Sequence, residues 1–118
     1  MPETVTANRD LKIIEARSSG NISRKEMFIS LQDMERVHED SGLQNVLLDA
    51  CDQTSLPGLL DLTKFATELP SYLKLAILID PISSINKGWI FLERAAQGSG
   101  KTVKTFESRQ QAMKWLAK

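Results

Sequence analysis

Two short apolar runs, residues 46–51 and 75–79, constrain the fold of this 118-residue chain more than any other feature. Runs with apolar residues on successive positions suit strands that are covered on both faces, as in a parallel sheet. The segment between them repeats apolar residues at helical spacing from Leu59 to Leu69, with Pro57 near its start and Pro70 just after its end. The sequence therefore predicts a strand, a crossover helix and a second strand.

Upstream of these runs, the chain is expected to form a strand and a helix. Residues 11–17 alternate as a strand, and residues 19–21 supply a turn. Ser23 and Glu26 have the spacing of a capping box, in which each side chain satisfies the exposed backbone N–H of the other residue. A helix with one buried face should therefore begin at Ser23 and end near Gly42.

Downstream of the runs, helix and strand alternate once more. Apolar residues at helical spacing predict a helix from Ile85 to Gly98, and residues 102–106 alternate as a strand. Ser108 has the position of an N-cap for a last helix. The order of elements is thus β-α-β-α-β-α-β-α.

This order predicts one α/β domain over residues 1–118. Strands joined by crossover helices favour a mainly parallel or mixed sheet of four to five strands. Residues 46–49 and 75–79 should form its central strands, because both are apolar throughout or nearly so. Residues 1–9 are expected to be an edge strand or a loose tail.

Composition limits the classes of function that remain open. Fifteen basic residues balance fifteen acidic ones, so we expect no nucleic acid partner. No stretch approaches the ~20 apolar residues that span a bilayer, so membrane insertion is not expected. The single cysteine, Cys51, fits a reducing compartment and favours a cytoplasmic location. With one histidine and one cysteine, the sequence predicts no structural zinc, and we expect neither a metal nor a cofactor.

Four segments carry a family resemblance. They are residues 20–23 before a helix, residues 47–49, residues 75–78 and residues 103–116, the last being a strand that finishes in Phe106 and a capped helix with Ala112, Trp115 and Leu116. Together they resemble the SpoIIAA-like family of the STAS/SEC14 domain superfamily, over residues 10–118. The resemblance implies the SpoIIAA/STAS fold.

The resemblance also implies a kind of function. In the better-understood relatives, the anti-sigma-factor antagonists, a serine in an Asp-Ser-Ser-Gly-Leu turn accepts phosphate and switches partner binding. A non-catalytic regulatory or protein-interaction module is therefore expected, binding another protein as a monomer or homodimer. The sequence departs from the family at the decisive position, because alignment on Gly58 places Leu56 at the phosphoacceptor. Thr54 and Ser55 lie just before it, where a hydroxyl would cap the helix, and phosphorylation of either residue is the less favoured alternative.

The candidate regulatory or binding loop runs from Asp49, within the first apolar run, to Gly58 and comprises Asp49, Asp52, Thr54, Ser55 and Gly58. Asp49, Asp52 and Asp80 follow or end strands, where paired carboxylates could hold Mg²⁺. Turn and cap roles are favoured instead, because aspartate before proline commonly initiates turns. Neighbouring carboxylates should also raise the pKa of Cys51, which argues against a reactive thiolate.

Two other motifs have ordinary structural interpretations. Residues 98–102 copy the end of a phosphate-binding P-loop, but Ala95 replaces its first glycine and the segment leads from a helix into a strand. A helix-ending turn is expected there, without ATP binding. Trp89, Phe91 and Trp115 could line an apolar pocket, although core packing is favoured. A small-molecule or lipid-binding domain of the SEC14-like type is the alternative function, and a large cavity beside Trp89 would support it. No catalytic residues are identified.

Overall fold

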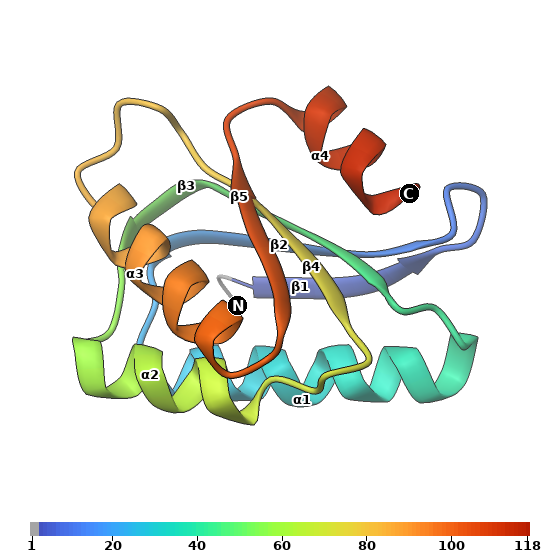
Figure 1. Ribbon diagram of the computed structural model, residues 1–118, viewed down its shortest axis with the longest axis horizontal. Helices are drawn as coiled ribbons and strands as arrows, with labels where there is room; N and C mark the ends of the chain where they lie inside the picture. The colour runs from blue at the N-terminus through green and yellow to red at the C-terminus, as the bar shows by residue number, and fades with distance from the viewer. Residues whose placement is uncertain (1–2) are drawn as a thin grey trace.

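The computed structural model describes residues 3–118 and contains a five-stranded mixed sheet with helices on both faces (Figure 1). In chain order the elements are β1 (Glu3–Asn8), β2 (Ile13–Asn21), α1 (Arg24–Ser41), β3 (Asn45–Ser55), α2 (Leu59–Glu68), β4 (Lys74–Leu78), α3 (Asn86–Gly98), β5 (Thr102–Phe106) and α4 (Arg109–Leu116). The strands lie in the order β1-β2-β3-β4-β5, with β1 antiparallel to β2 and all other pairs parallel. The α/β class and the alternation expected from the sequence are confirmed.

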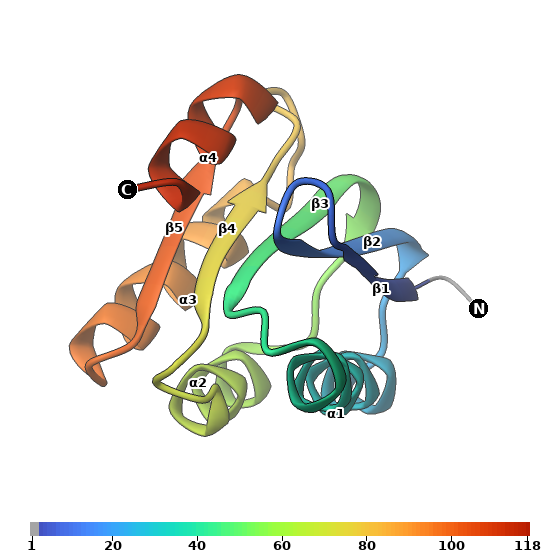
Figure 2. The same cartoon turned by 90° about the vertical axis from the view of Figure 1, so that its right-hand side faces the viewer.

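Three helices cover one face of the sheet and one helix covers the other (Figure 2). Side chains alternate across a strand, so Val46 and Leu48 of β3 pack beneath α1, α2 and α3, whereas Leu47 packs beneath α4. In β4, Leu75 and Ile77 face the three helices and Ala76 faces α4. Both strands are interior and buried on both faces, as their apolar runs predicted.

The expected capping box opens α1. The Ser23 side chain accepts a hydrogen bond from the Glu26 backbone N–H at 3.2 Å, and the Glu26 carboxylate accepts one from the Ser23 N–H at 3.0 Å. Gly42 ends the helix at φ 76°, a conformation that favours glycine. No helix within the described part of the chain is long and apolar enough to cross a membrane.

The first strands differ from the expectation at both ends. Strand β2 begins at Ile13, because residues 9–12 form the turn of the β1–β2 hairpin and leave Leu11 half exposed. The turn expected at residues 19–21 lies inside β2, where Gly20 has φ 69° and the register against β3 shifts. A glycine at positive φ lets a strand absorb such an irregularity without ending. The edge strand expected within residues 1–9 is present as β1, and residues 1–2 lie outside the described part.

The P-loop-like segment is the C-terminal turn of α3. The Lys101 N–H donates to the Ala96 carbonyl at 2.9 Å, and the Gly100 N–H donates to the Gln97 carbonyl at 3.1 Å. These two bonds, with Gly100 at φ 78°, form a Schellman motif. The left-handed residue is therefore Gly100 and not Gly98, which remains helical.

Candidate functional site

The candidate binding loop is mostly strand. The predicted range from Asp49 to Ser55 belongs to β3, which stays paired with β2 as far as the partners Asn21 and Ser55.

 Only residues 56–58 connect β3 to α2 as a loop. The loop could not be delimited from sequence because the polar end of β3 has no apolar alternation, and its pairing depends on how far β2 continues beside it.

Thr54 and Ser55 do not cap α2, contrary to the expectation. Both residues lie in β3, and the N-cap of α2 is Gly58, at φ −66° and ψ 170°, without a side-chain cap bond. The Thr54 hydroxyl instead donates to the Asn21 side-chain oxygen at 3.0 Å, across to β2. The first turn of α2 therefore lacks the cap that a hydroxyl or carboxylate at residue 58 would supply.

Replacing Gly58 by serine is expected to stabilise the protein by ~0.5–1 kcal/mol, through a new cap and a less flexible unfolded chain. The backbone of Gly58 suits any residue, and a Cβ there meets no atom within 4 Å. Urea denaturation measures the change. Gly42→Ser is the matched control and should instead destabilise, because Gly42 has φ 76°. A Gly58→Ser variant less stable than the wild type would contradict the assignment of the cap.

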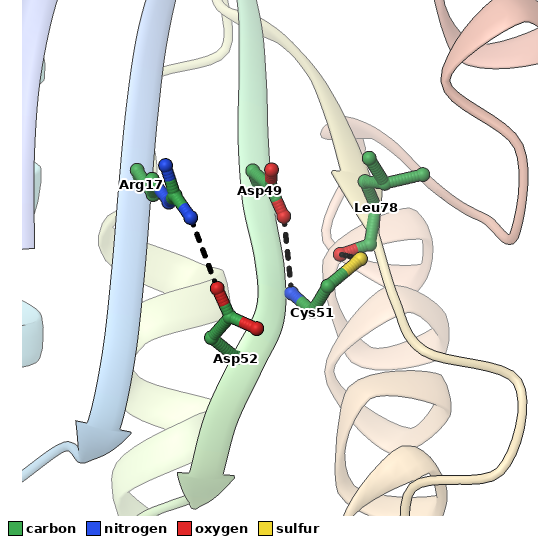
Figure 3. Close-up of polar contacts among 5 residues, drawn as sticks. All are labelled: Arg17, Asp49, Cys51, Asp52 and Leu78. Atoms are coloured by element: carbon green, nitrogen blue, oxygen red, sulfur yellow. Dashed lines mark hydrogen bonds and ion pairs between the residues drawn. The ribbon is translucent and has the colours of Figure 1, made fainter.

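The three aspartates of the predicted carboxylate group have separate partners. The Asp52 carboxylate forms an ion pair with Arg17 of β2 at 3.0 Å, and the Asp49 carboxylate accepts the Cys51 backbone N–H at 3.1 Å (Figure 3). The Asp80 carboxylate accepts the Ile82 N–H at 3.1 Å, which is the turn role expected for it. Within residues 3–118 no three acidic, histidine or cysteine side chains are grouped to hold a metal ion.

Cys51 lies beside these carboxylates and is a poor nucleophile. Burial of the thiol raises its pKa to about 11, and the hydrogen bond and negative charge of Asp49 add to the shift. Its sulfur contacts the Leu78 carbonyl oxygen on β4 at 3.9 Å (Figure 3). The upward shift of the Cys51 pKa expected from neighbouring carboxylates has the direction found, with contributions from Asp49, Asp80 and Asp52, and the thiol is protonated at neutral pH.

The rate of Cys51 alkylation by iodoacetamide should rise with pH, with a midpoint at about 11, because only the thiolate reacts. In denaturant the midpoint should fall to the ordinary value of ~8.5. Because folding raises the pKa of the thiol, its contribution to folding stability is fully present below pH ~8.5, the unfolded pKa. This contribution is lost as the pH rises through the folded-state pKa of about 11. A folded-state rate that levels off by pH 9 would contradict this prediction.

The short connection from β3 to α2 is packed against the start of α3. A Cβ added to Gly88 would lie 2.7 Å from the Leu56 Cδ1, so Leu56 occupies the space that a larger residue at position 88 would need. Leu56 is partly buried and packs on the main core, as does Ile85 just before α3. Leu56 is therefore an apolar contact between two helix starts.

Three exposed apolar side chains at this end of the sheet were not recognised from sequence. Leu59 and Leu60, in the first turn of α2, are 59% and 88% exposed, and Ile82, between β4 and α3, is 89% exposed. Leu59 was expected on the buried face of its helix, which is instead formed by Leu62, Phe65 and Ala66. The signal was the Leu59-Leu60 pair, because adjacent helical residues point in different directions.

We call Leu59, Leu60 and Ile82 the apolar edge. Both of its segments follow the carboxyl ends of neighbouring parallel strands, β3 and β4, and so lie at the same end of the sheet. In Figure 1 the start of α2 and the connection from β4 to α3 are both on the left of the molecule, opposite the β1–β2 turn. The ion pair between Arg17 of β2 and Asp52 of β3 provides polar side chains on the strands of this sheet.

The aromatic residues do not share a pocket. Trp89 is buried in the core beneath α3, while Trp115 packs on the opposite face of the sheet with its ring centroid 5.6 Å from that of Phe106. Phe91 is partly buried and packs on the core that holds Trp89. Core packing, the favoured interpretation, is confirmed for Trp89.

The layers, strand order and helix positions define a SpoIIAA-like fold. A structure of an uncharacterized DUF3478-family protein from Shewanella loihica PV-4, described as SpoIIAA-like, matches with a TM-score of 0.64 and 18% identity, covering 97% of this chain and 93% of that chain. An anti-sigma factor antagonist from Mycobacterium paratuberculosis matches with a TM-score of 0.62 and 14% identity, covering 98% and 95%. No family model matches the sequence, and no curated protein is significantly similar to it. At these identities the likeness establishes the fold alone.

Proposed function

We propose that this chain is a non-catalytic regulatory module that binds a partner protein through the apolar edge. The observation that carries the proposal is the exposure of Leu59, Leu60 and Ile82 at one end of the sheet. Large apolar side chains are enriched in protein interaction sites, and polar side chains usually surround such sites. The similar fold of an anti-sigma factor antagonist supports a regulatory role.

The candidate loop residues would support this contact in different ways. Leu56 packs on Gly88 and keeps the start of α2 in place beside α3. Asp52, paired with Arg17, and Thr54, bonded to Asn21, supply a polar margin on strands. Rigid elements of this kind can present a binding surface at little entropic cost.

The proposed contact is constitutive and not switched by phosphate on a serine. The position that resembles the family's phosphoacceptor holds Leu56, and the nearby hydroxyl residues Thr54 and Ser55 belong to a paired strand. The apolar side chain of Leu56 has no hydroxyl to accept a phosphate, so the proposed contact needs no prior modification at this position. The single cysteine agrees with action in the cytoplasm, which we include in the proposal.

The alternative of a lipid-binding domain finds little support in the cavities. The internal cavity beside Trp89 measures about 10 Å³, far below the ~300 Å³ of a small-molecule pocket. A much larger hollow, about 700 Å³, is an open groove on the outside of α1 and α2. Charged residues contribute much of its lining, among them Arg24, Lys64 and Glu68.

Site-specific photocrosslinking tests the proposal. A photoreactive residue placed at Leu60 should crosslink one protein in the native host, and mass spectrometry would identify it. Calorimetry with the purified partner should then show at least ~10-fold weaker binding for Leu60→Asp and Ile82→Asp, because a charge would be desolvated at the interface. Leu11→Asp is the matched control, since Leu11 is 50% exposed in the β1–β2 turn at the other end of the molecule.

Two results would contradict the proposal. One is equal crosslinking of the same protein from positions 60 and 11, and the other is unchanged affinity in both the Leu60→Asp and Ile82→Asp variants. Thermal denaturation of each variant must accompany the binding measurement, so that a loss of affinity is not confused with a loss of fold.

A further inference from the structure

The main core contains two polar groups without a hydrogen-bond partner among residues 3–118, and both line the same cavity. They are the Ser30 hydroxyl of α1 and the Trp89 indole N–H of α3. The two residues are 3% and 2% exposed, so bulk water does not reach them. A buried donor that forms no hydrogen bond loses its hydration without compensation, so such groups normally have a partner.

The cavity between them has the size of a single water molecule. Its volume is about 10 Å³, close to the least that one water requires. The side chain of Gln53 also lines it, from the end of β3. The rest of the lining is apolar and supplied by both the sheet and the helices, for example Met34, Leu75 and Phe65.

We propose that this cavity is a binding site for one structural water molecule, held by Ser30, Trp89 and Gln53. The indole N–H can only donate, so the water accepts a hydrogen bond from it. The Ser30 hydroxyl can accept or donate. The Gln53 side-chain oxygen already accepts a bond from the Ser18 hydroxyl and has a second lone pair for the water. Three partners are typical of a buried water.

The water would connect the core with the end of β3. Gln53 is 4% exposed, and its side-chain nitrogen donates to the Ser55 carbonyl at 2.8 Å, immediately before Leu56. A water bonded to Ser30 and Trp89 thus links α1 and α3 to the last residues of the strand. This inference does not depend on the proposed partner binding.

Two direct measurements test the site in the full chain. A high-resolution crystal structure should show one density peak at about 2.7–3.2 Å from both the Trp89 Nε1 and the Ser30 Oγ. In solution, the Trp89 indole proton should show cross-relaxation with a long-lived water, whereas Trp115, half-buried on the other face, is the reference indole. An empty cavity in the crystal, with no water signal at Trp89, would overturn the proposal.

The Ser30→Ala variant gives an independent test, because the two possibilities predict opposite signs for the change in Tm. If the hydroxyl binds the water, alanine should lower the Tm and remove the water signal at Trp89. If the cavity is dry and the hydroxyl unsatisfied, alanine should raise the Tm, and the proposal fails. Ser18→Ala is the matched control, because the buried Ser18 hydroxyl donates directly to Gln53 and its loss should lower the Tm.

Discussion

Replacing Ile77 by alanine is expected to lower the free energy of unfolding by ~2–5 kcal/mol, the range for deleting a large aliphatic side chain from a closed core. Ile77 lies in the interior strand β4, has no exposed surface and packs beneath α1, α2 and α3. Its removal loses buried apolar area, and the close packing on both faces of β4 leaves little room for the surroundings to collapse into the space. Urea denaturation monitored by circular dichroism measures the change.

The same substitution at Ile82 is the matched control. Ile82 is 89% exposed, so Ile82→Ala should change the free energy of unfolding by no more than ~0.5 kcal/mol. Equal effects at the two positions would contradict the assignment of β4 to the centre of the core. The pair also separates stability from binding, because only the Ile82 position belongs to the apolar edge.

Replacing Lys74 by methionine is expected to cost ~1–3 kcal/mol, because a charged donor is lost at a helix end. The Lys74 ammonium donates to the Trp115 carbonyl at 2.6 Å and to the Lys118 carbonyl at 3.3 Å, and it lies 4.8 Å from the centroid of the Trp115 ring. The Trp115 carbonyl lies in the last turn of α4, where it also accepts the Lys118 backbone N–H at 3.3 Å, and Lys118 lies just after the helix. Methionine retains most of the apolar stem and removes only the charged donor.

Lys104→Met is the control for the loss of a lysine beside an aromatic ring. The Lys104 ammonium lies 5.5 Å from the centroid of the Phe106 ring on an exposed part of β5, so its loss should cost at most ~1 kcal/mol. Calorimetric unfolding measures both variants. Equal stability of the Lys74 and Lys104 variants would show that Lys74 does not cap α4.

The elements that sequence predicted best are those whose signals are local. The capping residues Ser23 and Ser108 each accept the bond expected from the residue three positions on. The apolar runs in β3 and β4 are interior strands because no other position buries both of their faces. Such signals need no knowledge of the rest of the chain.

The candidate site was harder to predict because its geometry depends on distant partners. Thr54 is held by Asn21, 33 residues earlier, and Gln53 is held by Ser18, 35 residues earlier. The polar end of β3 is therefore a strand only because β2 continues beside it past Gly20. Arg17 was missed for the same reason, since only the parallel register brings it to Asp52.

The spatial order of the strands, which equals their order along the chain, bears on how the molecule is made. Each strand after β1 pairs with the strand synthesised just before it. Each pairing therefore closes only the hairpin turn or the single helical crossover between the two strands, which limits its cost in entropy. The sheet can thus grow outward from the β1–β2 hairpin as the chain lengthens. Until β5 pairs, however, the apolar strand β4 is an open edge, and a chain that stops before Thr102 is left with a surface prone to aggregation.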